Sequence, residues 1–260
     1  MAGLAFMSIS GVSYGVWSRQ QYAVCAGADA PVTALWDAGT KKRIKSKFIE
    51  TRAPYAESAF ENIETRLTAW ANDWARSKQV ACEATHVRKI DSEEVFERRQ
   101  ACLDERLLQF RALIDVLAVA DTTIVMNAPT AARGLPRVSH CLDALLLEQK
   151  SPSEISHDEI DPVFRARYLE ASALFSTAQY SSAAAKLEPL LTPALGDRPL
   201  AMGALLLGKI ATQLGDERRA KTYHQQAAEC AIRLGDAGLE ARALSRLYAA
   251  RSNESSSYEL

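Results

Sequence analysis

Cysteine and histidine are the residue types in this sequence whose spacing could support chemistry. The five cysteines and four histidines are Cys25, Cys82, Cys102, Cys141, Cys230, His86, His140, His157 and His224. Cysteines can pair as disulfides, and cysteine together with histidine can bind zinc or form a nucleophilic pair. Which use applies depends on the elements that bring these side chains together.

Disulfides are the favoured interpretation, and ordinary buried thiols are the alternative. Cys82 and Cys102 lie at similar distances on either side of a predicted turn, so an antiparallel hairpin would place them side by side. Cys25 and Cys141 bracket the first domain, and a bridge between them would join its ends. Cys230 lies in a separate region and would stay free. Disulfides of this kind persist only in an oxidising compartment.

A zinc site is a weaker interpretation because the sequence offers few ligands for it. Cys82 and His86 are four residues apart on one face of a predicted helix, where they could hold a metal ion. Cys102 is the one obvious third ligand. The sequence therefore predicts no metal site and no cofactor.

No catalytic site is predicted from the remaining polar residues. His140 adjoins Cys141, but neighbours in sequence do not face each other on a helix, and a nucleophilic pair needs a third, orienting group. The acidic pairs at 93–94 and 158–159 stand at predicted helix starts, where the helix dipole favours negative charge. We therefore expect a protein that is not an enzyme.

The composition narrows the class of protein. The chain has 260 residues, of which 48% are hydrophobic and 24% charged, which excludes a fully disordered, collagenous or many-span membrane protein. The 31 basic and 32 acidic residues give a net charge of -1, which argues against a dedicated nucleic-acid binder. Ala, Leu, Glu and Arg are plentiful and β-branched alternation is scarce, so the chain is predicted to be all-α.

The start of the chain is a candidate membrane segment. Residues 1–18 carry no charge, and the first charged residue is Arg19. A membrane-spanning helix needs about 20 apolar residues. Residues 1–19 therefore suggest a partial transmembrane segment. A signal-like anchor, without the usual basic N-terminal region, and a buried or disordered N-terminus are the alternatives.

Residues 20–148 predict a helical domain built on a long hairpin. Pro31 opens an amphipathic stretch that runs through Phe48 and includes a basic run, which is a solvated helix face or a contact for anionic lipid. Pro54 then starts a longer helix whose apolar residues recur at helical spacing, including Trp70 and Trp74, which are assigned to the core. Asp91 is the predicted N-cap of the returning helix, with Glu94 as its capping-box partner. A shorter helix ends near residue 134.

Residues 149–160 read as a polar linker, and residues 161–260 as helical repeats. Asp161 and Pro162 form a helix start, with Asp as N-cap and Pro at the first helical position. Two units then align at an offset of 37 residues, with Ala178 on Gly215, close to the tetratricopeptide period of 34. A third unit begins at Gly238 and is incomplete. At least three repeats are usually needed to bury a continuous core.

The repeat pattern assigns packing and groove positions. The residues expected at the close-packed positions are Leu207, Gly208, Gly215, Ala220 and Ala227 in the second unit and Ala171 and Ala183 in the first. Helical phase places Lys209, Thr212 and Gln213 toward the groove of such repeats. We expect this groove to bind a protein or peptide.

The first domain resembles a known family. The matching blocks are CAGADAPVTALWD at 25–37, PYAESAF at 54–60, ACEATHVR at 81–88, RRQACLDERLLQFRALIDVLAVAD at 98–121 and LPRVSHCLDALL at 135–146. In this order and spacing they are similar to the region that follows the kinase domain and membrane span in large bacterial Ser/Thr protein kinases, common in myxobacteria. In that family tetratricopeptide repeats come next.

The resemblance implies an anchor in the inner membrane, with the globular part outside the cytoplasm and a kinase domain linked in cis or acting in trans. This chain has no Gly-rich phosphate loop, no Val-Ala-Ile-Lys strand, no His-Arg-Asp loop and no Asp-Phe-Gly. We therefore expect a non-catalytic sensory and protein-interaction module that binds no nucleic acid. A free-standing cytosolic tetratricopeptide scaffold with reduced cysteines is the alternative.

Overall fold

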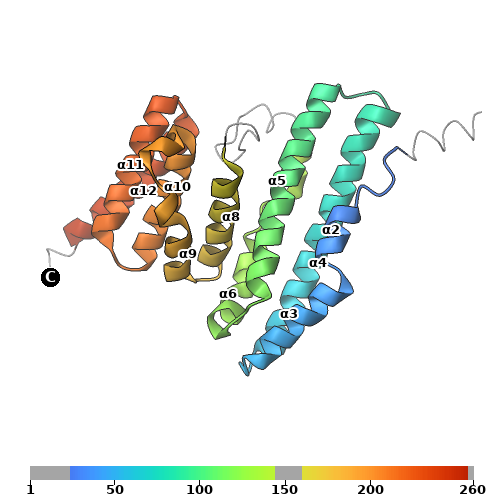
Figure 1. Cartoon of the computed structure of the whole chain (residues 1–260), viewed down its shortest axis with the longest axis horizontal. Coiled ribbons are helices and arrows are strands. Elements are labelled where there is room, and N and C mark those ends of the chain that lie inside the picture. The colour runs from blue at the N-terminus through green and yellow to red at the C-terminus, as the bar shows by residue number, and fades with distance from the viewer. Residues whose placement is uncertain (1–23, 144–159, 257–260) are drawn as a thin grey trace, which may run out of the picture.

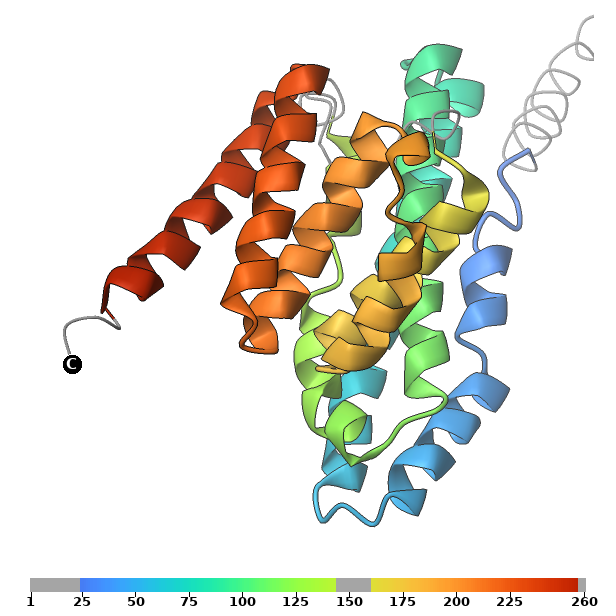
Figure 2. The ribbon, with the colours of Figure 1, turned by 60° about the vertical axis from the view of Figure 1, so that its left-hand side comes forward.

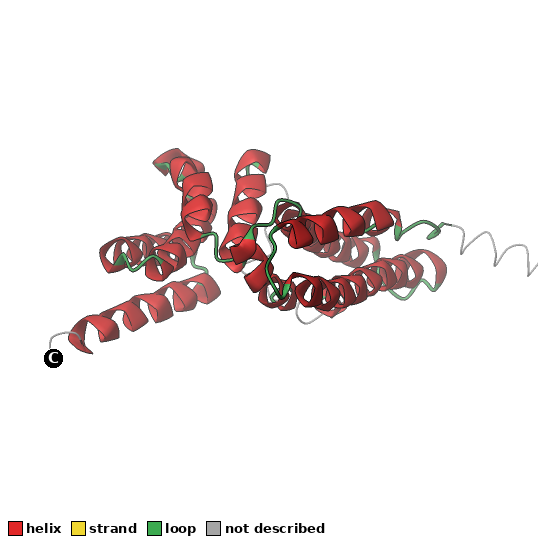
Figure 3. Cartoon of the chain, turned by 90° about the horizontal axis from the view of Figure 1, so that it is seen from below, coloured by secondary structure: helices red, strands yellow, loops and turns green. Residues whose placement is uncertain are grey.

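The computed structural model describes residues 24–143 and 160–256, and within these ranges the chain forms helices and turns without any strand (Figure 3). The candidate membrane segment at 1–19 and all but the last residue of the predicted linker at 149–160 lie outside the described residues. No helix within the described ranges has both the length and the apolar character needed to cross a membrane. The prediction of an all-α chain is confirmed for this part of the protein.

The first half of the described chain is organised by a long helix hairpin (Figure 1). Its elements are α2 (Ala30–Leu35), α3 (Ala38–Glu50), α4 (Ala56–Cys82), the π-helical turn η1 (Glu83–Val87), α5 (Glu93–Leu117), α6 (Thr122–Arg133) and the 3-10 turn η2 (Val138–Leu142). The helices α4 and α5 lie side by side, and Lys78 on α4 contacts Asp104 on α5, with 2.7 Å between Nζ and Oδ1. Helices α3 and α6 both pack against α4.

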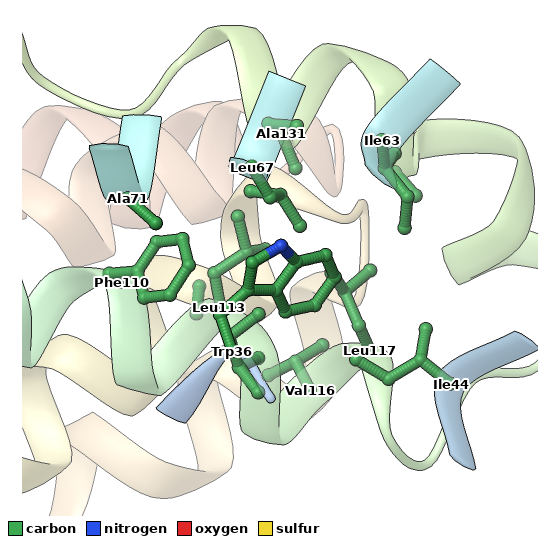
Figure 4. Packing of buried hydrophobic residues seen from close by; sticks show 14 of the residues in the cluster. Trp36, Ile44, Ile63, Leu67, Ala71, Phe110, Leu113, Val116, Leu117 and Ala131 are labelled. Carbon is green, nitrogen blue, oxygen red and sulfur yellow. The ribbon is translucent and has the colours of Figure 1, made fainter. Parts of the chain in front are cut away.

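The hairpin core is filled by aromatic and aliphatic side chains (Figure 4). Trp74 is completely buried and donates its indole N–H to the carbonyl of Leu103, at 2.7 Å. Trp70 is partly exposed, stacks on Phe110 and donates its indole N–H to the carbonyl of Pro136. Trp36, which caps the C-terminal end of α2, packs edge-to-face with Phe110. Both tryptophans of α4 therefore serve the core, as their spacing predicted.

Two helix starts differ from the sequence expectation. The stretch expected to continue from Pro31 through Phe48 is broken at Asp37, whose carboxylate accepts the backbone N–H of Thr40 and begins α3 as a separate helix. The N-cap of α5 is Ser92, whose hydroxyl accepts the N–H of Val95. Asp91, the predicted cap, is instead ion-paired with a guanidinium of α5. The ion pair holds that carboxylate away from the helix end.

The second half consists of helices that follow one another through short turns. Its elements are α8 (Pro162–Ser176), α9 (Tyr180–Leu187), the 3-10 turns η3 (Glu188–Leu190) and η4 (Pro193–Leu195), α10 (Asp197–Gln213), α11 (Glu217–Leu234) and α12 (Ala237–Ser256). Asp161 caps α8 as predicted, accepting the N–H groups of Val163 and Phe164. Helix α10 packs on α11, and α11 packs on α12, at the red end of the ribbon (Figure 2).

The turn between α8 and α9 recurs between α10 and α11, 37 residues later. The N–H of Gln179 donates to the carbonyl of Leu174 at 2.8 Å, and the N–H of Asp216 donates to that of Ala211 at 2.9 Å. The residue before each donor has a left-handed backbone, with φ of 62° at Ala178 and 75° at Gly215. Alanine replaces glycine at this strained position in the first hairpin, which explains why its turn is less obvious in the sequence.

Helix α8 packs on both halves of the molecule, between α5 on one side and α9 and α10 on the other (Figure 1). Ala173 belongs to the core of the first half, whereas Ala171 belongs to the core formed with α9 and α10. Arg165 on α8 is 3.6 Å from the buried carboxylate of Glu105 on α5. Gln179 also donates its side-chain amide to Asp121, which precedes α6.

Candidate binding groove

The structure pairs the first four cysteines differently from the expectation. Cys25 is bonded to Cys82, and Cys102 is bonded to Cys141, with Cα atoms 5.8 and 5.5 Å apart. The expected pairs, Cys82 with Cys102 and Cys25 with Cys141, are wrong. Equal distance from a turn places two residues at the same height of a hairpin but not on facing sides of the two helices. Cys230 is a free, buried thiol.

The disulfides also remove the zinc ligands that the sequence suggested. Both Cys82 and Cys102 have their sulfur in a disulfide, so neither offers a thiolate. His86 lies against the ring of Phe96 and near the carboxylate of Glu93 instead. Within residues 24–143 and 160–256, no group of three or more side chains is arranged to hold a metal ion.

Peptide mapping tests the observed pairing directly, because trypsin would release the four cysteines on separate peptides. Digestion without reduction is expected to give one cross-linked pair of peptides joining Cys25 to Cys82 and another joining Cys102 to Cys141, because the Cα separations in these pairs suit a disulfide. Reduction before digestion serves as the control and should release all four peptides. A cross-link between Cys82 and Cys102 would show that the pairing described here is wrong.

A hollow between α10 and α12 is the candidate binding site in the second half. Its volume is ≈ 350 Å³, and it opens to solvent between the two helices. The lining residues are Leu205, Lys209, Ala241, Arg242, Ser245, Arg246 and Ala249. The offset of 37 residues relates the cations on the two helices, because Arg246 follows Lys209 by 37 positions.

The three cations of this hollow, Lys209, Arg242 and Arg246, make no ion pair or side-chain hydrogen bond with any residue that the structure describes. Burial lowers the pKa of the Lys209 ammonium, and the guanidinium groups of Arg246 and Arg242 lower it further. Neighbouring cations without an opposing carboxylate raise the local positive potential. The site is therefore suited to an anionic ligand.

His224 on α11 lies behind this cationic hollow. Its side chain is 1% exposed and packs over Gly208, where an added Cβ would come within 2.4 Å of the imidazole Cε1. The imidazole Nδ1 is buried without a hydrogen-bond partner. Burial lowers the pKa of His224 to about 4, and the positive charges of Arg246 and Lys209 contribute to this shift. Only a glycine at position 208 leaves room for the ring.

Protein stability is expected to fall between pH 6.5 and pH 4 because of His224. The unfolded imidazole binds a proton near its ordinary pKa of 6.5, whereas the folded one resists protonation down to about 4. The unfolded state therefore binds more protons in this window, and acidification from pH 7 to pH 5 should cost about 1–2 kcal/mol at this site. Urea unfolding of the wild type and of His224→Gln at both pH values measures the difference. An equal loss in both proteins would rule out His224 as its source.

The residues predicted to pack between the repeats lie where the pattern expects them. Of the predicted groove residues, one lines the hollow and two do not. Leu207, Gly208, Ala220, Ala227, Ala171 and Ala183 are buried, and Gly215 forms the left-handed turn. Lys209 lines the hollow. Thr212 and Gln213 are exposed beyond it, and the Thr212 hydroxyl donates to the carbonyl of Gly208.

Sequence reasoning missed Arg242, Arg246 and His224. Arg242 and Arg246 stand 37 positions after Leu205 and Lys209, so the repeat offset could have predicted them. His224 occupies the position of Leu187 in the first hairpin by the same arithmetic, and its spacing from Ala220 and Ala227 places it on the same buried face of the helix.

Comparison with known proteins adds no relative: no family model, no curated protein and no solved structure matches this chain. The described residues define an all-helical, disulfide-bonded protein with a cationic hollow between two of its C-terminal helices.

Proposed function

We propose that this chain is a non-catalytic sensory and protein-interaction module, resembling the extracytoplasmic tetratricopeptide part of a membrane Ser/Thr protein kinase. Its α8–α12 region binds a segment of a partner protein along the side lined by α10 and α12. A kinase domain, in cis or in trans, is the element that such a module would serve.

The observation that carries the proposal is the repeated helix hairpin. The donor and acceptor positions of the turn hydrogen bond, the left-handed residue and the small buried residues Ala183 and Ala220 all recur at an offset of 37. Tetratricopeptide arrays place the first helices of successive repeats side by side and bind ligands along them. In this chain those first helices are α8, α10 and α12.

The chemistry of the hollow indicates what kind of segment binds. Lys209, Arg242 and Arg246 supply positive charge, while Leu205 and Ala241 supply apolar surface. An acidic segment with an apolar neighbour complements this combination, because opposite potentials steer association and fix the register of the complex.

Peptide selection followed by binding measurements tests the interaction function. Peptides selected from a random display library are expected to be acidic and to lose at least about tenfold in affinity when Arg242 and Arg246 are both replaced by alanine. The matched control replaces Lys42 on α3 and Arg218 on α11, two exposed cations outside the hollow, by alanine. Equal losses in both double variants would show that charge alone, and not the groove, binds the peptides.

A free-thiol count tests the proposed location. The two disulfides support an oxidising compartment. Denatured protein from its native cells, alkylated without reduction, is expected to show one reactive thiol, that of Cys230. Five reactive thiols would favour the cytosolic scaffold.

A further inference from the structure

The cations in the hollow differ from Arg198 and Arg233 in having no carboxylate partner. Arg198 on α10 contacts Asp236, just before α12, at 3.0 Å, and Arg233 on α11 contacts Asp197 on α10 at 2.6 Å. Lys209, Arg242 and Arg246 make no such contact with any residue within the described ranges. Three cations held at one site without counter-charge repel one another, and a bound anion would relieve this repulsion.

A second, independent observation at the same place is the unpartnered imidazole of His224. Its Nδ1 is shielded from solvent and lacks a hydrogen-bond partner, which is a costly state for a polar atom. The ring packs on Gly208, the residue before Lys209 on α10, and lies close enough to Lys209 and Arg246 for their charges to act on it. A buried polar group without a partner calls for a physical explanation, and its position next to a cluster of cations makes a functional role a candidate.

We propose that this hollow binds a phosphate monoester carried on the partner segment, with Lys209, Arg242 and Arg246 contacting its oxygens and His224 behind them. The peptide part of the ligand rests on the proposed function, whereas phosphate binding can be tested without any peptide.

Charge matching favours a phosphate monoester over a single carboxylate. A carboxylate brings one negative charge, and would leave two of the three cations uncompensated. A phosphate monoester brings about −1.5 to −2 charges at pH 7 and three acceptor oxygens. Guanidinium groups match this geometry with paired N–H donors. Arg242 and Arg246 are four residues apart, so both lie on the face of α12 that lines the hollow.

The acidic groups in the neighbourhood make their direct contacts elsewhere, although the charge of Arg242 helps to lower the pKa of Asp236. Asp236, which precedes α12, accepts from Arg198 and from the backbone N–H of Leu239. Glu105, on the far side of α8, lies beside Arg165. The charged groups that act on His224 are therefore Lys209 from α10 and Arg246 from α12.

Phosphate binding leaves a signature on His224. A bound dianion neutralises the cations that disfavour protonation of the imidazole, so the pKa of His224 should rise when the site is filled. The shift of the His224 pKa is the diagnostic, and not the pH dependence of affinity, because the phosphate monoester itself takes up a proton near pH 6 (second pKa about 6). A merely structural histidine that senses no ligand would not show this shift.

The experiment titrates the full chain with O-phosphoserine blocked at both ends (N-acetylated and C-amidated), and with N-acetylglutamic acid α-amide as the single-carboxylate probe, while NMR follows the His224 ring protons. We expect saturable shifts and a raised His224 pKa with O-phosphoserine, and at least about tenfold weaker binding in Lys209→Ala and in Arg246→Ala. The Lys42→Ala, Arg218→Ala double variant should bind like the wild type. Far-UV circular dichroism and urea unfolding confirm that each variant is folded. Equal affinity for both probes, or unchanged affinity in the two groove variants, would overturn the proposal.

A peptide experiment separates this proposal from the broader one. Degenerate peptide libraries that are identical except for serine, phosphoserine or glutamate at a central position are bound to the full chain. Preference for the phosphoserine library, lost in Arg246→Ala, supports both proposals. Binding of free O-phosphoserine without binding of any library supports the phosphate site and overturns the peptide function. Equal binding of all three libraries supports the peptide function and overturns the phosphate site.

Discussion

Replacing both Cys102 and Cys141 by alanine is expected to lower the free energy of unfolding by about 4 kcal/mol. The disulfide closes a segment of 39 residues, and its loss restores that conformational freedom to the unfolded chain. Both cysteines are buried, one on α5 and one on η2, so the bond also holds η2 against the long hairpin. Urea unfolding monitored by circular dichroism measures the change.

The control for this variant is Cys230→Ala, which removes a buried thiol that takes part in no disulfide. Reductant should destabilise this control as strongly as the wild type. It should affect the double variant less, because only the Cys25–Cys82 bond remains to be reduced. A loss below about 1 kcal/mol in the double variant would mean that the unfolded chain is already constrained without the bond.

Replacing Trp74 by alanine should cost about 3–5 kcal/mol, because it opens a cavity between α4 and α5. The indole is completely buried, and its N–H donates to the carbonyl of Leu103. Trp74→Phe keeps much of the volume and loses the hydrogen bond, so we expect about 1–2 kcal/mol for it. Denaturant unfolding of both variants gives the two values.

Trp70→Ala is the matched comparison for Trp74→Ala, because it removes the same side chain one turn earlier. Trp70 is partly exposed, so its loss creates less cavity despite the stacking on Phe110. Its variant should be less destabilised than Trp74→Ala. A larger cost at Trp70 would mean that the stacked pair, and not the buried indole, dominates the stability of the hairpin.

The helices of this chain were predictable where local rules decide them. The periodic apolar residues of α4 and α5, and the Asp161–Pro162 start of α8, depend on helical spacing and capping alone. The start of α5 was misplaced by one residue because two neighbouring residues could cap it. The structure pairs Asp91 with Arg99, about two turns along the same helix, and leaves the cap to Ser92, a choice between two good capping residues that the capping rule alone does not make.

The disulfide pairing and the groove needed information that no local rule contains. Cys82 bonds to Cys25 because the segment before α2 lies beside the C-terminal end of α4. The hydrophobic pattern does not specify that placement. Helical phase assigned Lys209 to a repeat groove, and in the structure Lys209 lines the hollow between α10 and α12. Arg242 and Arg246, the neighbouring cations on α12, could be predicted only by applying the offset of 37 to charged residues as well as to small ones. The burial of His224 depends on the missing side chain of Gly208.

Helix α8 contributes side chains to the cores of both halves, so non-covalent contacts join the two halves in addition to the chain itself. Ala173 lies in the core of the first half, and Ala171 lies in the core of the second. The Arg165–Glu105 ion pair links α8 to α5. Two separately expressed pieces, one ending after η2 and one beginning before α8, should therefore reassemble as a non-covalent heterodimer. Because α8 contacts both α10 and α5, a displacement of α10 on ligand binding would have a direct path of packed side chains to α5.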